Sequence, residues 1–502
     1  MSSSSSITSA ERLAVRRTPV LAACLMATFM SAIEATIVAT AMPGIVAALG
    51  NFNLYSWVFS VYMLSQAVSI PIYGRLADMY GRKRMFYAGT GLFLVASALC
   101  GLASDMTLLV VFRALQGLGA GGVQPIASTI VGDIYAPEER ARMQGVMSTV
   151  YGAAAVAGPS LGVLLVQHAG WQAVFWINLP IGIVALAMVH RFLHETVQPQ
   201  PRRVDYTGSA LLMLAAGALA LALSSAGLAF AHGHEMTRLT VLGDTVVGVA
   251  ALLFLLWHER RAAEPILPLQ LWRERIVSAG SLGSGAVGAL MMGVCAFLPV
   301  YVQGVMGHSA AVSGAVLGAM SVFWTLSAIG SGTLLRHGSY RGIATLGAIL
   351  LLAGVLELSA MTPQAGVLWP MAGAALLGTG VGLCQTVFLV SIQSSVPWQQ
   401  RGAATSSVMF LRCLGQAMGA AVLGAAVLLS LQAAAPGTSH TLYQLMAPVR
   451  RAELSPPVLM HLAGIAANAI TSAYLLGALL AVATCVIAWR LPPGLRPAQQ
   501  SH

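Results

Sequence analysis

Long apolar runs alternate with short polar segments along almost the whole chain. A membrane-spanning helix needs roughly 20 mainly apolar residues, and runs of about that length recur from the first fifth of the sequence to its end. The pattern predicts an all-α integral membrane protein with fourteen transmembrane helices, near residues 17–42, 54–74, 86–104, 107–133, 143–166, 171–190, 207–230, 240–257, 277–303, 310–335, 341–361, 367–395, 402–431 and 468–490.

Two polar connections divide these helices into groups of six, two and six. The segment "HETVQPQPRRVDYTG" precedes the middle pair, and "HERRAAEPILPLQLWRER" follows it. The first apolar run is too long for a signal-peptide core and is interpreted as a retained helix. The predicted parts are an N-terminal tail at 1–16, a six-helix bundle at 17–191, a linker with two extra helices at 192–276, a second six-helix bundle at 277–490 with an outer loop near 432–467, and a tail at 491–502.

The charged residues support this topology. Only 8% of the 502 residues are charged and 57% are hydrophobic, whereas a soluble domain carries about 25% charged residues. With a cytoplasmic N-terminus, 21 of the 26 basic residues fall on the cytoplasmic side, three on the outer side and two within spans. Basic residues concentrate in cytoplasmic loops, so both termini are expected in the cytoplasm, with the protein in the inner or plasma membrane. The net charge of +10 is scattered in these loops, which argues against nucleic-acid binding.

Several chemistries find no support in the sequence. The six cysteines lie within apolar runs and form no CxxC pair, so neither structural disulfides nor a metal site is expected. The one lysine, Lys83, is followed by Arg84, which excludes a phosphate-binding G-x-x-x-x-G-K-[ST] loop. No H-E-x-x-H motif occurs either. We therefore expect no enzyme, no cofactor and no ATP-driven pump, and the proton gradient is the remaining energy source.

One acid, Glu34, stands in the apolar stretch "SAIEATIVATAMP" at residues 31–43. A charge at the bilayer centre costs roughly 2.5–3.5 kcal/mol even on the lenient insertion scale, so such an acid normally faces a partner or an aqueous cavity. Burial favours the neutral form of a carboxyl group, while a nearby cation favours the charged form. Glu34 is therefore a candidate for proton exchange. The alternative is a permanently ionised structural residue held by an arginine.

A weak internal repeat leads to a family. "GRLADMYGRKR" at 74–84 and "GTLLRHGSYRG" at 332–342 follow corresponding helices of the two bundles, as in transporters built from two related halves. "GRLADMYGRKRM", "RALQGLGAGGVQP", "AGPSLGVLL" and "WQAVFWINLPIG" occur in the order of the motifs of the major facilitator superfamily. The chain resembles its fourteen-span drug:proton antiporter branch, of multidrug efflux type. It departs from that branch at Glu34, Gln172 and Gly318, where aspartate, arginine and proline are usual.

The resemblance implies roles for three sets of residues. Arg113 is expected to be the counter-charge of Glu34, with Gln116 on the same face; a purely structural cross-link is the alternative. A loop is expected to act as a conformational latch, in which the glycines permit tight turns and close helix approach; the alternative is a loop that only orients the helices. This loop comprises Gly74, Asp78, Gly81, Arg82, Lys83 and Arg84, and the expected antiporter motif, or alternatively a simple packing kink, comprises Gly158, Pro159 and Gly162.

The substrate cavity is expected between the two halves near the membrane midplane. Aromatic, methionine and amide side chains suit varied amphipathic compounds. Candidates are Trp57, Tyr62, Gln66 and Gln116 in the first half and Phe297, Tyr301, Trp324, Glu357, Gln385 and Phe388 in the second. Arg412, which also lies within a span, is interpreted as structural.

These features predict a proton-coupled exporter of hydrophobic or cationic drugs that works by alternating access. Its partners are a small drug-like molecule, protons and the lipid bilayer. If the cell has two membranes, the resemblance also implies a periplasmic adaptor and an outer-membrane channel. Two alternatives stay open: an exporter of a specific metabolite or siderophore on the same scaffold, and a membrane receptor that does not transport.

Overall fold

The computed structural model describes residues 17–135, 137–193, 205–232, 235–262, 271–396, 401–434, 445 and 455–492. All regular secondary structure in these ranges is helical, which confirms the all-α fold class. The long helices are α1 (Arg17–Leu49), α2 (Tyr55–Tyr80), α3 (Arg82–Gly101), α4 (Met106–Ile134), α5 (Pro137–Ala169), α7 (Asn178–Phe192), α8 (Tyr206–His232), α9 (Glu235–Glu259), α10 (Arg275–Val300), α11 (Ala310–His337), α12 (Tyr340–Ser359), α13 (Leu368–Ser395), α14 (Arg401–Ala434) and α17 (Pro456–Trp489).

Each predicted apolar run overlaps a helix of the structure, the sixth as the short α6 (Ala173–Trp176) followed by α7. Ten helices of the described residues are long and apolar enough to cross a membrane, or eleven when the two segments of α1, bent by 42° between Glu34 and Thr36, count as one span. The protein is therefore a multi-pass membrane protein. The figure of fourteen spans stays a prediction.

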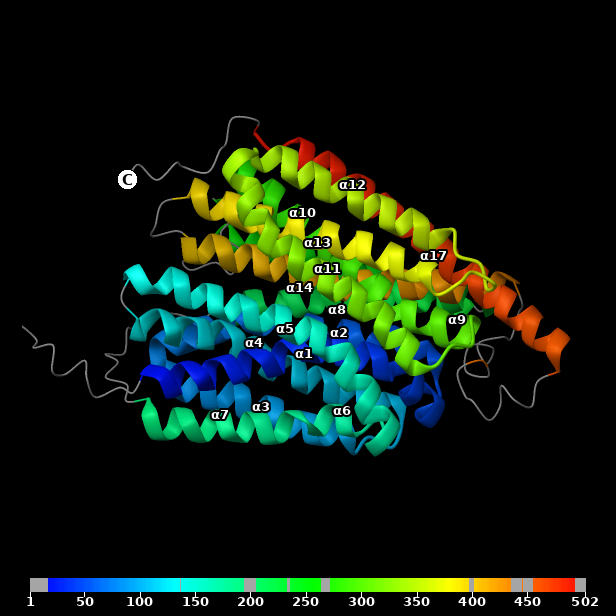
Figure 1. Ribbon diagram of the computed structural model, residues 1–502, viewed down its shortest axis with the longest axis horizontal. Helices are drawn as coiled ribbons and strands as arrows, with labels where there is room; N and C mark the ends of the chain where they lie inside the picture. Colours follow the sequence, from blue (N-terminus) through cyan, green and yellow to red (C-terminus); the bar gives the residue numbers. More distant parts are fainter. Residues whose placement is uncertain are drawn as a thin grey trace, which may run out of the picture.

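The helices form two bundles that lie side by side, α1 to α7 in one and α10 to α17 in the other (Figure 1). The extra helix α8 packs against α2 of the first half and α14 of the second. Its partner α9 packs against α8 and exposes large apolar side chains such as Leu239, Leu253 and Trp257. The hairpin of α8 and α9 thus covers the seam between the halves on one side.

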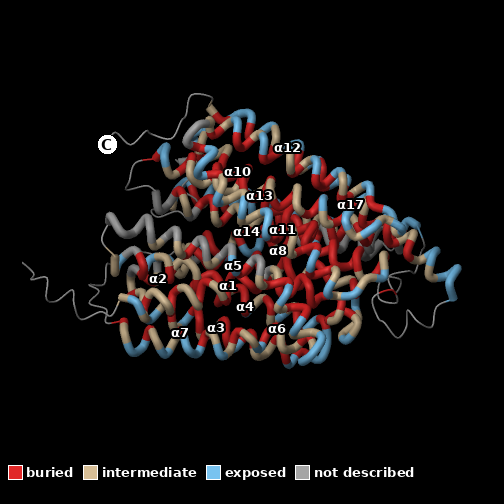
Figure 2. The backbone as a smooth tube through the Cα atoms, viewed as in Figure 1, coloured by how far each residue is buried: buried red, intermediate tan, exposed pale blue. Residues whose placement is uncertain are grey.

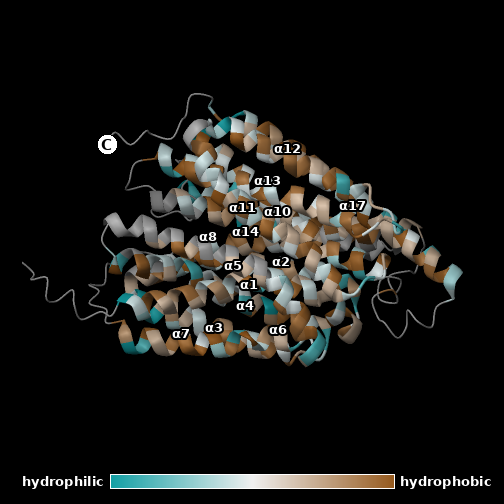
Figure 3. Cartoon of the chain, in the orientation of Figure 1, coloured by the Kyte–Doolittle hydropathy of each residue, from teal (hydrophilic) through white to brown (hydrophobic). Residues whose placement is uncertain are grey.

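Hydrophobic residues run along most of the length of the helices, and hydrophilic residues gather toward the helix ends (Figure 3). The most buried residues lie in the interior, where helices of one or both bundles meet (Figure 2). An apolar exterior of this extent needs lipid around it, because soluble proteins rarely expose apolar patches beyond a few hundred Å².

The two halves contact each other at the end of the molecule where α1 ends and α2 begins, which we call the far end; α1 begins and α17 ends at the terminal end. The hydroxyl of Tyr55 donates to the backbone oxygen of Ala296, and the Tyr55 and Phe297 rings are 5.2 Å apart. A Cβ at Gly424 of α14 would lie 2.5 Å from the Cβ of Ser56. Because Gly424 lacks a side chain, α2 and α14 approach closely here.

Basic residues of the described ranges gather at the terminal end. The arginine at the start of α1, the cluster at the start of α3 and the arginines around α9 and α10 all lie there, because successive helices run in opposite directions. The basic residues at this end whose side chains are described are Arg17, Arg82, Lys83, Arg84, Arg191, Arg260, Arg261, Arg273, Arg275, Arg341 and Arg490.

Several helices extend beyond their predicted bounds, such as α1, which continues to Leu49, and α5, which begins at Pro137; two further differences bear on predicted features. Helix α2 continues to Tyr80, so Gly74 lies inside a helix rather than at its end. Helix α17 begins at Pro456, within the predicted outer loop of 432–467. Ser455 precedes it in an extended conformation and proline occupies its first position, which is a favoured way to start a helix. The first turns of α17 are exposed although they carry apolar side chains such as Val458 and Met460.

Candidate functional site

A fully buried ion pair joins the first and fourth helices. The Oε1 atom of Glu34 lies 2.5 Å from Nη1 of Arg113, and both residues are 0% exposed. Asn178, at the start of α7, donates from Nδ2 to the other carboxylate oxygen of Glu34 over 2.8 Å. Both oxygens of the acid therefore have a donor, and the predicted pairing of Glu34 with Arg113 is present.

The guanidinium of Arg113 is held from several sides. Its Nη1 also donates to Oε1 of Gln116 over 2.6 Å, and its Nε donates to the backbone oxygen of Val58 over 3.1 Å. Gln116 in turn donates to the hydroxyl of Ser97 over 2.8 Å. The ring of Tyr62 lies 4.0 Å from the guanidinium carbon, a cation–π contact that strengthens when water is excluded. The network connects α1, α2, α3, α4 and α7.

This geometry explains how the acid Glu34 is accommodated within an apolar span. The acid does not face lipid: it lies inside the first bundle, and its charge is compensated by Arg113. Removing one member of a buried ion pair costs about 3–5 kcal/mol, because the other charge is left uncompensated. Protonation of Glu34 has the same consequence for Arg113, so a proton arriving here would force the network to rearrange.

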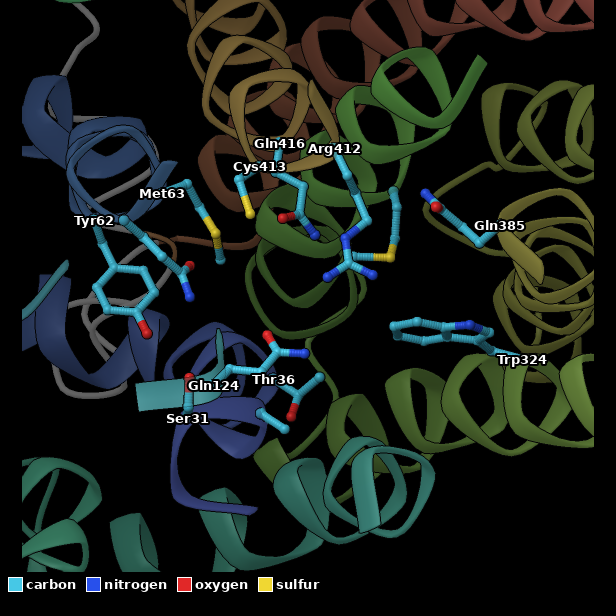
Figure 4. A pocket seen from close by; sticks show the side chains of 13 residues that line it. Ser31, Thr36, Tyr62, Met63, Gln124, Trp324, Gln385, Arg412, Cys413 and Gln416 are labelled. Carbon is cyan, nitrogen blue, oxygen red and sulfur yellow. The ribbon is translucent and has the colours of Figure 1, made fainter. Parts of the chain in front are cut away.

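A cavity of about 70 Å³ lies between the two halves. Drug-sized sites occupy about 300–1,000 Å³, and a water molecule takes up about 30 Å³, so the cavity in this conformation is narrow. Its lining side chains come from both bundles and converge on a common space (Figure 4). They are Ser31, Ala32, Thr36, Tyr62, Met63, Gln66, Gln124, Met291, Trp324, Gln385, Arg412, Cys413 and Gln416.

Four of the predicted cavity residues, Tyr62, Gln66, Trp324 and Gln385, line this space. The remaining candidates are not among its lining residues. Gln116 belongs to the Arg113 network, and Glu357 lies near the far end of α12, where its backbone oxygen accepts from Trp369. Tyr301, Phe297 and Phe388 are buried elsewhere and Trp57 is half-buried.

Sequence reasoning missed several residues of the site. Ser31 lies three residues before Glu34 and so near the same face of α1, whereas Thr36, two residues after Glu34, lies on another face of that helix. Gln124 lies eight residues after Gln116, about two helical turns away on α4. Helical spacing from Glu34 and Arg113, the two charged residues recognised within spans, is the signal that could have found Ser31 and Gln124. The lining residues that the sequence analysis did not name as candidates are Ser31, Ala32, Thr36, Met63, Gln124, Met291, Cys413 and Gln416.

Comparison with known proteins identifies the family. The model of the Major Facilitator Superfamily matches residues 24–420, which is most of the chain. The chain belongs to the major facilitator superfamily. It is therefore a membrane transporter by family.

The similar proteins include bacterial multidrug transporters. "Multidrug resistance protein 3" of Bacillus subtilis is 34% identical over 400 residues, covering 80% of this chain and 77% of the relative. "Multidrug transporter protein MdtP" of the same organism is 33% identical over 410 residues, covering 82% and 75%. A bacterial homologue of the human lysosomal transporter Spinster, inward-facing and unoccupied, superposes with a TM-score of 0.68 over 94% of this chain and 96% of its own at 16% identity. At that identity the likeness speaks for the fold alone.

The turn after the second helix lies at Gly81. The φ angle of Gly81 is +97°, a backbone conformation that residues with side chains rarely adopt. Gly74 lies within α2 and nothing lies within 4 Å of the position of its missing Cβ, so the expectation of a turn or close approach there is wrong. The continuation of α2 past residue 74 is the physical reason. The Asp78 side chain lies outside the described residues.

The basic residues of this loop make contacts within the first half. Nε of Arg82 lies 2.8 Å from Oδ2 of Asp133 at the end of α4. Nζ of Lys83 donates to the backbone oxygens of His190 and Leu193, over 3.0 and 2.6 Å, and so satisfies carbonyls at the end of α7. Arg84 is exposed. These contacts fasten α3 to α4 and α7, while the role as a latch between conformations stays a prediction.

The residues of the expected antiporter motif lie where α5 packs between the two halves of the transporter. A Cβ added at Gly158 would overlap the hydroxyl of Thr36, and one added at Gly162 would overlap the hydroxyl of Thr40, both on α1. On another side of α5, the backbone oxygen of Pro159 lies 3.3 Å from the place of a Cβ at Gly314 of α11. All three motif residues are buried, and Thr36 also lines the cavity.

Proposed function

We propose that this chain exports amphipathic drug-like compounds in exchange for protons, by alternating access of the central cavity to the two sides of the membrane. The support from similar proteins is their multidrug transport, at 34% and 33% identity over most of the chain. The support from the site is a titratable acid inside the bundle, close to a cavity lined by both halves.

The single observation that carries the proposal is the position of Tyr62. This side chain lines the cavity, and its ring lies against Arg113, the partner of Glu34. A change in the cavity that moves Tyr62 therefore reaches the ion pair through one side chain. Glu34 itself does not line the cavity, so its proton exchange depends on a rearrangement of this layer.

The energy available from protons is sufficient for export. A membrane potential of 100 mV is worth about 2.3 kcal/mol per charge. At about 1.4 kcal/mol per tenfold concentration ratio, one proton exchanged for a neutral compound supports roughly 50-fold accumulation. Glu34 alone therefore provides enough coupling capacity for useful efflux.

We further propose that the terminal end faces the cytoplasm, because basic residues concentrate in cytoplasmic loops and the described ones gather at that end. Fourteen spans then bring both termini to the cytoplasm. The contacts at the far end close the outer side, which corresponds to access from the cytoplasm. A periplasmic adaptor and an outer-membrane channel remain expectations for a cell with two membranes.

The test uses everted membrane vesicles with a fluorescent drug and a pH-sensitive dye. Wild-type protein is expected to take up the drug with release of protons from the lumen. Glu34→Gln removes the titratable group and is expected to abolish both signals, while Glu34→Asp keeps a carboxyl group and is expected to retain part of each. Normal proton-coupled uptake by Glu34→Gln would refute the assignment.

Folding is controlled separately, because Glu34→Gln leaves Arg113 uncompensated. The double variant Glu34→Gln/Arg113→Gln removes both charges and is expected to fold at least as well as the single variant, yet to remain uncoupled. A transport screen over dyes, antiseptics and metabolites separates multidrug export from export of one metabolite. Ligand binding without any turnover would favour the receptor alternative.

A further inference from the structure

The cavity contains a positive charge that the ion pair of the first half does not neutralise. Among the thirteen residues that line it, Arg412 is the one that carries a formal charge, and none is an aspartate or a glutamate. The remaining polar surface is dominated by four glutamine amides, which are neutral. The lining therefore presents a net charge of +1.

Arg412 comes from α14 in the second half, and its guanidinium extends into the space between the lining side chains (Figure 4). Its Nε atom is buried and has no hydrogen-bond partner within the described part of the chain. Its side-chain neighbour is the thiol of Cys413, which carries no compensating charge when protonated. Arg113, by contrast, is paired with a carboxylate, an amide and a backbone oxygen.

An arginine in this situation is prepared to bind an anion. Arg412 is half-buried, and its cation lacks an acidic partner among the residues that line the cavity, so its charge is better compensated when a carboxylate or similar acid group enters. The planar guanidinium matches such groups with two parallel hydrogen bonds. A cationic ligand in the same space would meet repulsion. The negative charge of Glu34 does not offset it, because Arg113 compensates that charge within the first bundle.

The rest of the lining suits an apolar or aromatic body. The indole of Trp324 lies on one side of the space and the phenol ring of Tyr62 on the other (Figure 4). Met63 and Met291 contribute polarizable thioethers, which adapt to ligands of varied shape. Aromatic rings also provide broad apolar contact for ligands.

We propose that the cavity selects amphipathic organic anions, in which an acid group pairs with Arg412 and an aromatic or other apolar body contacts Trp324 and the methionines. The proposal rests on the proposed function, since it names the substrate class of the same cavity. It differs from the sequence-based expectation of hydrophobic or cationic substrates, because the charged residue that lines the cavity is Arg412 and not Glu34.

The test measures binding to the purified full-length protein in detergent, with three probes of one ring system. These are an aromatic carboxylate, its methyl ester and a trimethylammonium analogue. We expect the carboxylate to bind at least tenfold more tightly than the ester, and the ammonium compound to bind most weakly. Arg412→Gln is expected to remove the preference for the acid while leaving the affinity for the ester within about twofold, and Arg412→Lys is expected to keep part of the preference.

Two results would overturn the proposal. One is a wild-type protein that binds the ester or the ammonium compound as tightly as the acid. The other is an Arg412→Gln variant with undiminished preference for the acid. If Arg412→Gln also loses ester binding, the Arg412→Lys variant decides. The proposal requires that this variant bind the ester normally and show a lower ratio of acid affinity to ester affinity than wild type.

The outcomes separate this proposal from the proposed function. Glu34→Gln is expected to keep the preference for the acid in the binding assay although it no longer couples transport to protons. If Arg412-dependent binding holds but wild-type vesicles show no proton exchange, the antiport function fails and the substrate class stands. If vesicles exchange protons for cationic dyes independently of Arg412, the substrate class fails and antiport stands.

Discussion

Replacement of Gly162 by alanine is expected to separate α1 from α5 and thereby lower both stability and transport. Gly162 belongs to the expected antiporter motif on α5 and faces Thr40 and Ile37 of α1. The added Cβ would overlap the hydroxyl of Thr40, and would lie 3.0 Å from the backbone oxygen of Ile37 and 3.3 Å from its Cγ1 atom. Backbone cannot turn away as a side chain can, so at least part of the overlap must be relieved by helix movement.

The magnitude follows from these contacts. Ordinary contact for a Cβ begins at 3.4 Å, so α5 must retreat by about 0.4 Å even if the Thr40 hydroxyl rotates away. Overpacking of this kind typically costs 1–3 kcal/mol. Alanine gains about 1 kcal/mol over glycine in a helix interior, which partly hides the cost. The control must therefore receive the same gain.

Gly91 in α3 provides this control, because an alanine there meets no atom within 4 Å. The assay is thermal unfolding of the purified variants in one detergent, combined with drug uptake in everted vesicles. Gly91→Ala is expected to be at least as stable as wild type. Gly162→Ala is expected to lie about 1–3 kcal/mol below Gly91→Ala and to transport more slowly.

A compensating change tests the cause. Thr40→Ala removes the hydroxyl that the new methyl group meets, so the double variant Thr40→Ala/Gly162→Ala is expected to recover most of the lost stability. The Ile37 backbone oxygen at 3.0 Å leaves a remainder. The packing explanation is wrong if Gly162→Ala equals Gly91→Ala in stability and turnover, or if removal of the Thr40 hydroxyl brings no recovery.

Two further predictions concern coupling and orientation. Tyr62→Ala is expected to open a path from the cavity to Arg113 and to let protons leak without substrate, whereas Tyr62→Phe keeps the ring and stays tight; equal proton flux in both variants of a liposome assay would contradict this. In intact cells, a membrane-impermeant maleimide is expected to label Ser104→Cys at the far end and to spare Arg84→Cys at the terminal end, in a background without the native cysteines, and everted vesicles should reverse the pattern. Labelling of Arg84→Cys from outside would invert the proposed topology.

The helical architecture follows from the sequence because the length of an apolar run and the thickness of a bilayer are directly related. The ends of the helices are harder to predict from the sequence. Hydropathy ended the second helix near residue 74, although α2 continues to Tyr80, because a helix that leaves the membrane becomes polar without unwinding. The start of α17 was also missed, although the sequence marks it by Ser455 followed by two prolines, a pattern typical of a helix start.

The candidate site was predictable where a residue type is unusual for its surroundings. A lone acid in an apolar run requires a partner, and Arg113 is the pairing that the structure contains. Asn178 was not singled out, since a neutral amide in a span is common. The lining of the cavity depends on which face of each helix turns inward, as for Gln124 and Gln416, and helix rotation is set by tertiary packing rather than by local sequence.

The two proposals together constrain how coupling works. Glu34 and Arg113 belong to the first half, while Arg412 projects from α14 of the second. In a carrier where proton and cationic drug compete for one carboxylate, coupling is direct competition. Here substrate and proton bind different groups on different bundles, so each can influence the other only by favouring one arrangement of the halves. We therefore expect Tyr62 and the α1–α5 contact to be the places where such a change reaches the ion pair, which is why the ring of Tyr62 and the missing side chain of Gly162 are the positions to test.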